Sequence, residues 1–98
     1  MSLPVSRAQV KYLRSLGRKK VRATEGKLLV EGLNGVEAAV AAGLADELFM
    51  SDEACASGRG RALAESTVPV RSIEERDVQA LGETRTPAGV FALVRDPV

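Results

Sequence analysis

Histidine is absent from this 98-residue sequence, and Cys55 is its single cysteine. A disulfide framework needs at least two cysteines, and zinc clusters and Cys–His nucleophile pairs need residues that this sequence lacks. We therefore expect no metal site and no cofactor held by this chain, and an intracellular, cytoplasmic location where thiols stay reduced. Cys55 is expected to be a small packing residue rather than a reactive thiol.

Aromatic residues and long apolar runs are also scarce. The aromatic residues are Tyr12, Phe49 and Phe91, too few for binding RNA by stacking splayed bases, so contact with phosphate and ribose is the better expectation. The weakly polar stretch 38–45 is far shorter than the ~20 residues that a membrane span needs. No apolar segment follows the basic N-terminus, so neither a signal peptide nor a membrane partner is expected.

Charge is strongly segregated along the chain. Residues 1–27 hold eight Lys or Arg and one acid, a local charge of +7, whereas residues 28–98 hold six basic and twelve acidic residues, a local charge of −6. The formal net charge of +1 conceals this division. Such a concentration of cations favours a polyanionic partner, and RNA is the leading candidate.

Four basic residues recur near the N-terminus at intervals of four, three and four positions: Arg7, Lys11, Arg14 and Arg18. At 3.6 residues per turn they share one narrow face of a helix. The opposite face is apolar: Val10, Leu13 and Leu16. The pattern predicts an amphipathic helix that begins at a Ser6–Gln9 capping box and ends at Gly17.

No acid within this segment offsets the basic face, although ordinary solvated helices pair Glu with Lys four residues apart. Lys19, Lys20 and Arg22 extend the positive charge into an expected loop. A solvated surface is the alternative interpretation, both for the helix face and for Lys20 and Arg22.

Strands and helices alternate in the rest of the chain. We expect strands at 27–31, 47–50, 68–71 and 90–94, the third short or at an edge because of Pro69 and the last central because it is apolar throughout. Helices are expected at 33–42, after 51–53, and from a Ser72–Glu75 capping box to Gly82. Gly58 and Gly60 favour splitting the middle helix in two.

This alternation predicts an α/β fold, a three-layer α/β/α sandwich with a mostly parallel sheet of about four strands. The length suits one domain. We expect it to occupy residues 1–95, with 96–98 as the start of a linker.

Three segments together resemble a known family. They are 10–16, then 20–22 leading to Val30-Glu31-Gly32, and 84–90 with its Thr-Arg-Thr-Pro-Ala-Gly-Val sequence. They are similar to the N-terminal substrate-binding domain of SpoU/TrmH-type (SPOUT) RNA 2′-O-ribose methyltransferases, and the resemblance covers nearly the whole chain. Many relatives have a basic residue where Asn34 stands here.

The resemblance implies a fold related to ribosomal proteins that bind kink-turn RNA, and a structured RNA partner, ribosomal RNA above all. It also implies a linker to a knotted catalytic domain that binds S-adenosylmethionine and makes the whole enzyme a homodimer. That domain is not in this sequence, so no catalytic residue can be assigned. The alternatives are a stand-alone ribosomal-type RNA-binding protein and a protein-interaction or dimerisation module.

Candidate site residues follow from the charges and from the resemblance. The expected RNA contacts are Arg7, Lys11, Arg14, Arg18, Lys19, Lys20, Arg22 and Arg85. Glu31 is expected to be structural, accepting hydrogen bonds from the neighbouring basic segment. Thr84 and Thr86 either bond phosphate or 2′-hydroxyl oxygens or simply form a turn.

Overall fold

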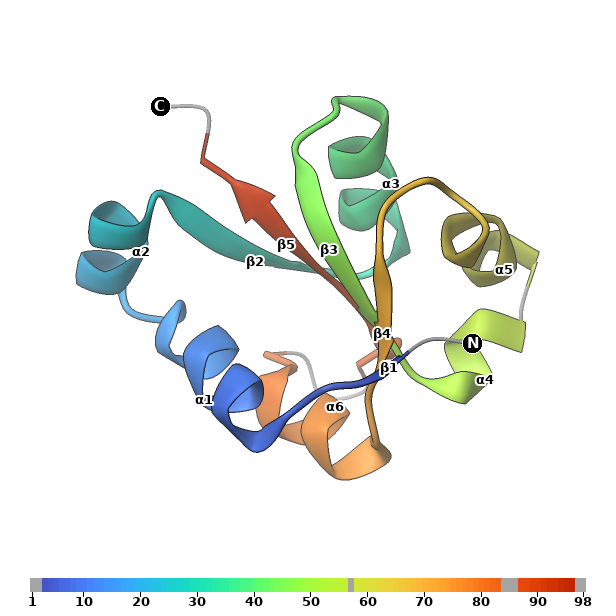
Figure 1. The fold of residues 1–98 in the computed structure, drawn as a ribbon, viewed down its shortest axis with the longest axis horizontal. Coiled ribbons are helices and arrows are strands. Elements are labelled where there is room, and N and C mark those ends of the chain that lie inside the picture. Colours follow the sequence, from blue (N-terminus) through green and yellow to red (C-terminus); the bar gives the residue numbers. More distant parts are fainter. Residues whose placement is uncertain (1–2, 57, 84–86, 97–98) are drawn as a thin grey trace.

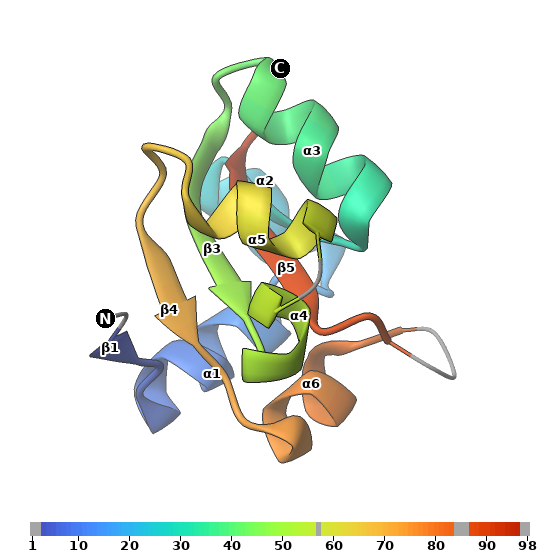
Figure 2. The same ribbon diagram turned by 90° about the vertical axis from the view of Figure 1, so that its right-hand side faces the viewer.

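A five-stranded sheet runs through the middle of the molecule, with helices on both of its faces (Figures 1 and 2). The structure is a computed structural model that describes residues 3–56, 58–83 and 87–96. The elements are β1 (Leu3–Pro4), α1 (Arg7–Ser15), α2 (Lys19–Glu25), β2 (Lys27–Glu31), α3 (Leu33–Ala41), β3 (Ala45–Met50), α4 (Asp52–Ala56), α5 (Gly58–Ala64), β4 (Val70–Ser72), α6 (Glu75–Leu81) and β5 (Val90–Arg95). No helix among these described residues is long and apolar enough to span a bilayer.

The strands lie in the order β1-β4-β3-β5-β2. β1, β4 and β3 pair in parallel, and β5 pairs antiparallel with both β3 and β2, so four strands point one way and β5 opposes them. The expected α/β sandwich with a mostly one-directional sheet and a central last strand is therefore confirmed. The sheet has one strand more than expected, because β1 is only two residues long and leaves no pattern in the sequence. The strand after Pro69 is short, as expected, but it is not at the edge of the sheet, because β1 pairs with its outer side.

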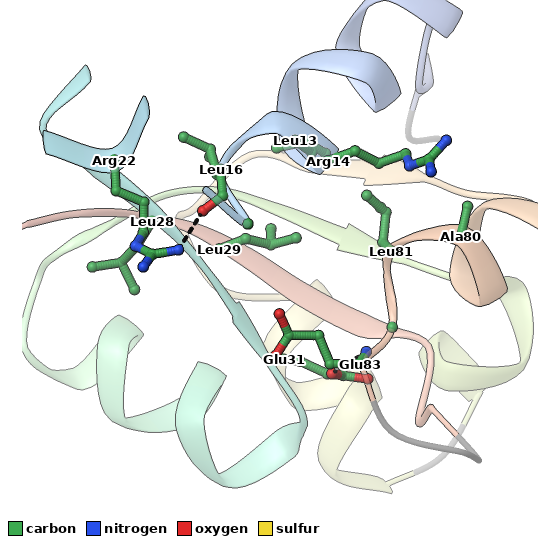
Figure 3. A pocket seen from close by; sticks show the side chains of 12 residues that line it. Leu13, Arg14, Leu16, Arg22, Leu28, Leu29, Glu31, Ala80, Leu81 and Glu83 are labelled. Atoms are coloured by element: carbon green, nitrogen blue, oxygen red, sulfur yellow. Dashed lines mark hydrogen bonds between the residues drawn. The ribbon is translucent and has the colours of Figure 1, made fainter. Parts of the chain in front are cut away.

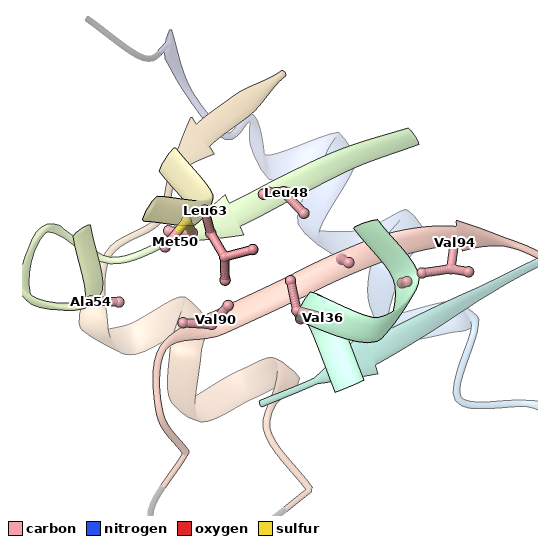
Figure 4. Packing of buried hydrophobic residues seen from close by; sticks show 9 residues of the cluster. Val36, Leu48, Met50, Ala54, Leu63, Val90 and Val94 are labelled. Atoms are coloured by element: carbon pink, nitrogen blue, oxygen red, sulfur yellow. The ribbon is translucent and has the colours of Figure 1, made fainter. Parts of the chain in front are cut away.

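Alternating residues of β3 and β5 build two separate cores. Leu48 and Met50, with Val90 and Ala92, face α3, α4 and α5 (Figure 4). The residues between them, Phe49 and Phe91, are fully buried on the other face against α1 and α6. These two rings stand directly opposite each other in the β3–β5 register, so the period-two pattern of the central strands supplies both cores.

Helix boundaries agree with the sequence only in part. The Ser6 hydroxyl accepts a hydrogen bond from the backbone N–H of Gln9 (3.1 Å), but the Gln9 side chain donates to Glu47 Oε1 (3.1 Å) instead of completing a capping box. The Ser72–Glu75 box is wrong: α6 has Glu74 at its N-cap and no side-chain cap. The expected split of the middle helix is confirmed by α4 and α5.

The basic segment after α1 is a helix, not the expected loop. α2 covers Lys19–Glu25 and ends at Gly26, whose φ of 64° is left-handed. α1 already ends at Ser15, and Arg18 is the N-cap of α2. The expected continuous face of four cations is therefore divided between two helices, because residues 16–18 turn the chain before Arg18 is reached.

Gly89 is a position where alanine should be costly. Its φ is 77°, and an added Cβ would lie 2.6 Å from Ser51 Oγ, while its carbonyl accepts the Ser51 N–H (3.0 Å). We expect Gly89→Ala to lower the free energy of unfolding by about 2 kcal/mol or more in urea denaturation. Gly58→Ala is the matched control, because a Cβ there meets open space; equal midpoints for the two variants would contradict this account.

Candidate nucleic-acid interface

Helix α1 packs its apolar side into the core and leaves its basic side in solvent. Val10, Leu13 and Leu16 are at most 5% exposed, whereas Lys11 and Arg14 are exposed. The amphipathic helix predicted from the sequence is thus confirmed, and the packing of its three apolar side chains fixes which way the cations point.

Helix α2 is attached to the end of α1 by side chains rather than by a buried face of its own, since none of its residues is fully buried. The Tyr12 hydroxyl donates to Glu25 Oε1 (3.2 Å), and burial together with this carboxylate raises the pKa of Tyr12, which keeps its proton available. Arg22 Nη1 donates to the Leu16 carbonyl (2.8 Å). Arg22 is therefore in part a structural residue that caps α1.

Outside residues 11–22, all but one of the described basic residues are used in ion pairs. The pairs are Arg7–Asp77 (2.6 Å), Lys27–Asp46, Arg59–Glu37 (2.5 Å), Arg71–Glu47 (2.5 Å), Arg76–Glu74 (3.2 Å) and Arg95–Asp46 (3.1 Å); the exception is Arg61. Within residues 11–22, five exposed cations form no ion pair with any described residue: Lys11, Arg14, Arg18, Lys19 and Lys20. We refer to these five as the basic surface, and Figure 1 shows the two helices that carry it following one another along one side of the molecule.

Arg7 does not belong to this surface. Its guanidinium bonds Asp77 on α6, a carboxylate whose side chain is only 3% exposed, and this hydrogen bond raises the pKa of Arg7. The expectation that no acid offsets the basic face of α1 is therefore wrong at Arg7. Its partner lies 70 residues away in the chain, which a local pattern does not reveal.

The start of α2 is electrostatically unfavourable for the helix. Lys19 and Lys20 occupy its first turn, which contains no acid, and Arg18 provides no side-chain cap. Backbone N–H groups give a helix N-terminus a partial positive charge, so cations there reduce helix stability. The stability of the helix therefore does not explain these two lysines.

A groove opens beside the basic surface, between the end of α1, α2, β2 and the end of α6 (Figure 3). Its volume is about 690 Å³, and Arg14, Arg22 and Glu31 are among the residues that line it. Glu31 Oε1 accepts a hydrogen bond from the backbone N–H of Glu83 (3.0 Å). This bond comes from the segment after α6, whereas donors from the neighbouring basic segment were expected from the sequence.

Sequence reasoning missed the groove because its walls come from opposite ends of the chain, 13–17 and 80–83. The hydrophobic periodicity of α1 and α6 predicts that each helix is buried, but not that their ends meet over β2. Arg85, which was expected to contact RNA, and Thr84 and Thr86, which were expected either to bond RNA or to form a turn, lie outside the described residues.

Sequence reasoning also missed a guanidinium at the start of α3. Arg59 on α5 donates from Nη2 to Asn34 Oδ1 (2.6 Å) and pairs with Glu37. The hydrogen bond between Arg59 and Glu37 lowers the pKa of Glu37 and raises the pKa of Arg59. Asn34, where the resemblance noted above implies a basic residue, therefore has a cation beside it that another helix supplies.

The described part of the chain holds no group of three His, Cys, Asp or Glu side chains placed to bind a metal ion. Cys55 is partly buried, and burial raises the pKa of its thiol. This environment favours the packing role expected from the sequence.

Comparison with family models identifies residues 7–92 as an MRM3-like substrate-binding domain. Comparison with curated proteins by sequence finds no match. Among solved structures, an RNA 2′-O ribose methyltransferase superimposes with a TM-score of 0.83 at 23% identity, over 99% of this chain and 38% of its own.

The SpoU methyltransferase AviRb from Streptomyces viridochromogenes, solved with the cofactor AdoMet, gives a TM-score of 0.77 at 26% identity, over 95% of this chain and 37% of its own. A protein from Porphyromonas gingivalis assigned to the TrmH family of RNA methyltransferases gives 0.76 at 25% identity, over 96% and 36%. This chain therefore spans less than two fifths of the solved proteins that it matches. The resemblance inferred from the motifs is confirmed, and the chain belongs to the family of MRM3-like substrate-binding domains, the substrate-binding part of SpoU-type RNA methyltransferases.

Proposed function

We propose that this domain grips the RNA substrate of an S-adenosylmethionine-dependent RNA 2′-O-ribose methyltransferase through the basic surface. The observation that carries the proposal is that the basic surface has no ion pairs with described residues, whereas six of the eight other described cations are paired. Unpaired, adjacent cations maintain a positive potential, and phosphate backbones neutralise such a potential with release of counterions.

The basic residues would act in different ways. Lys11, Lys19 and Lys20 present compact charges to phosphates, while the Arg14 guanidinium can hold two phosphate oxygens at once. These contacts would position the RNA without reading its sequence. Arg7 and Arg22 instead hold α1 in place. Arg7 bonds Asp77 on α6, and Arg22 bonds the Leu16 carbonyl at the end of α1.

The remaining parts of the proposal concern the whole enzyme and residues outside the described ranges. We assign binding of S-adenosylmethionine, methyl transfer and homodimer formation to a catalytic domain beyond these 98 residues; support comes from the family and from AviRb, which was solved with AdoMet. Ribosomal RNA as substrate, a cytoplasmic location, and RNA contact by Arg85, Thr84 and Thr86 are proposed on the family resemblance alone.

The salt dependence of RNA binding tests this function. With ~4 to 6 phosphate contacts, a plot of log affinity against log salt concentration should have a slope of roughly −3 to −5. The measurement is a filter-binding titration of the chain with a structured ribosomal RNA fragment and with a transfer RNA of similar length. An affinity that does not change with salt would mean that the basic surface is only a solvated face and does not contact phosphates. Tighter binding of the transfer RNA than of the ribosomal fragment would argue against ribosomal RNA as substrate.

A further inference from the structure

We infer that the groove between α1, α2, β2 and α6 receives one unpaired guanosine of the RNA, with Glu31 as the group that recognises the base. This inference rests on the proposed function and adds base selection to it. Three features of the groove carry the inference: the order of charges across it, its apolar floor, and the fixed position of the Glu31 carboxylate.

Charge changes sign across the groove in the order that a nucleotide requires. Arg14 and Arg22 stand on the α1–α2 side, and Glu31 and Glu83 stand at the opposite side (Figure 3). A phosphate is an anion and suits the arginines, whereas the base presents N–H donors that suit a carboxylate. A nucleotide lying across the groove satisfies both sides at once.

The floor between these charges is apolar. Figure 3 shows Leu29 and Leu81 between the arginines and Glu31, so the face of a base can lie against leucine side chains. The three aromatic residues of the chain do not line the groove, and the Arg14 guanidinium faces the phosphate. The base therefore contacts leucine side chains in place of an aromatic ring.

Glu31 selects the base because a carboxylate only accepts hydrogen bonds. The bond from the Glu83 N–H (3.0 Å) orients it, and a carboxylate accepts several hydrogen bonds together. Guanine has two adjacent donors on its Watson–Crick edge, N1–H and the N2 amino group. Adenine and cytosine place an acceptor next to their amino group, and uracil flanks its single N–H with two carbonyls, so each of these opposes a carboxylate.

Both size and chemistry require the guanosine to be unpaired. The groove volume of about 690 Å³ lies in the range of sites for single small molecules. In a Watson–Crick pair the guanine donors are already used by cytosine. Loops and bulges of structured RNA supply unpaired bases of this kind.

The test uses mononucleotides and the unaltered chain. In NMR titrations, GMP should shift the backbone amide signals of Gly17 and Gly82, which line the groove. IMP lacks only the N2 amino group and should bind about tenfold more weakly, and AMP at least as weakly as IMP. All three carry the same ribose phosphate, so equal affinities, or shifts confined to Lys19 and Lys20, would overturn the inference.

A variant tests whether Glu31 is the group that selects the base. Glu31→Gln retains an oxygen for the Glu83 N–H but introduces an amide donor, so the preference for GMP over IMP should disappear. The exposed Glu65 does not line the groove, so the Glu65→Gln control should keep both the preference and the RNA affinity of the unaltered chain. Loss of the preference in Glu31→Gln but not in Glu65→Gln supports the inference, and a retained preference in Glu31→Gln overturns it. Failure of the unaltered chain to bind RNA would instead reject the proposed function.

Discussion

Replacing Lys11, Lys19 and Lys20 with glutamate should weaken RNA binding by about a hundredfold or more at low salt. Each replacement removes a cation that forms no ion pair with a described residue and installs an anion at an exposed position. The phosphate contacts of the basic surface therefore become repulsions. Filter binding at fixed salt measures the effect.

The same variant should be at least as stable as the parent chain. Glutamates at positions 19 and 20 would fall in the first turn of α2, which now has two lysines and no acid, and acids near a helix N-terminus contribute about 0.3–1 kcal/mol each. Urea denaturation should thus show an unchanged or higher midpoint. Opposite signs for stability and binding are the result expected of residues kept for a ligand rather than for the fold.

The matched control replaces Arg59, Arg61 and Arg76 with glutamate, which changes the formal net charge by the same amount. Two of these residues are ion-paired on the surface, and all three lie outside the basic surface. Their replacement should reduce RNA affinity by less than about tenfold. Equal losses for the two triple variants would mean that overall charge, not the arrangement on α1 and α2, determines binding.

Phe91→Ala should lower the free energy of unfolding by about 3–5 kcal/mol, the usual cost of removing a buried phenylalanine ring. Phe91 is 0% exposed and stands opposite Phe49 across the β3–β5 pair. Its ring supports the core under both α1 and α6, and partial collapse there would also move the two walls of the groove. Urea denaturation gives the energy, and the amide signals of Gly17 and Gly82 report the groove.

Leu3→Ala is the control for this loss, because Leu3 is the large apolar side chain that stays 67% exposed. It should cost no more than ~0.5 kcal/mol. The double variant with Phe49→Ala should cost less than the sum of the two single changes, since the rings share one core. A Phe91 loss below about 1 kcal/mol would show that the two-core description of the sheet is wrong.

Local patterns determined what could be predicted from the sequence. β2 was predicted with its observed limits because an apolar run of strand length stands before Gly32. In the structure the two glycines that flank the strand, Gly26 and Gly32, both have positive φ. α1 was predicted because Val10, Leu13 and Leu16 repeat at the helical period. α2 was missed because its seven residues contain no such stripe and no side chain caps its N-terminus.

Contacts between distant segments could not be predicted in the same way. The Arg7–Asp77 pair joins helices 70 residues apart, and the Glu31–Glu83 bond spans 52. Residue types alone did suggest that Glu31 is structural, since a carboxylate at a strand end needs donors. Which donors it meets depends on β5 lying beside β2, a pairing that no pattern within β2 contains.

The Asp96 N–H donates a hydrogen bond to the Gly26 carbonyl (3.0 Å), which connects the end of α2 directly to the end of β5. Gly26 in turn donates to the Arg22 carbonyl (2.9 Å), and the Arg22 side chain bonds the end of α1. A force on α2 would therefore be transmitted through these backbone hydrogen bonds to Asp96, the residue that follows β5. Tension on the basic helix and displacement of the C-terminal end of the sheet would be coupled motions.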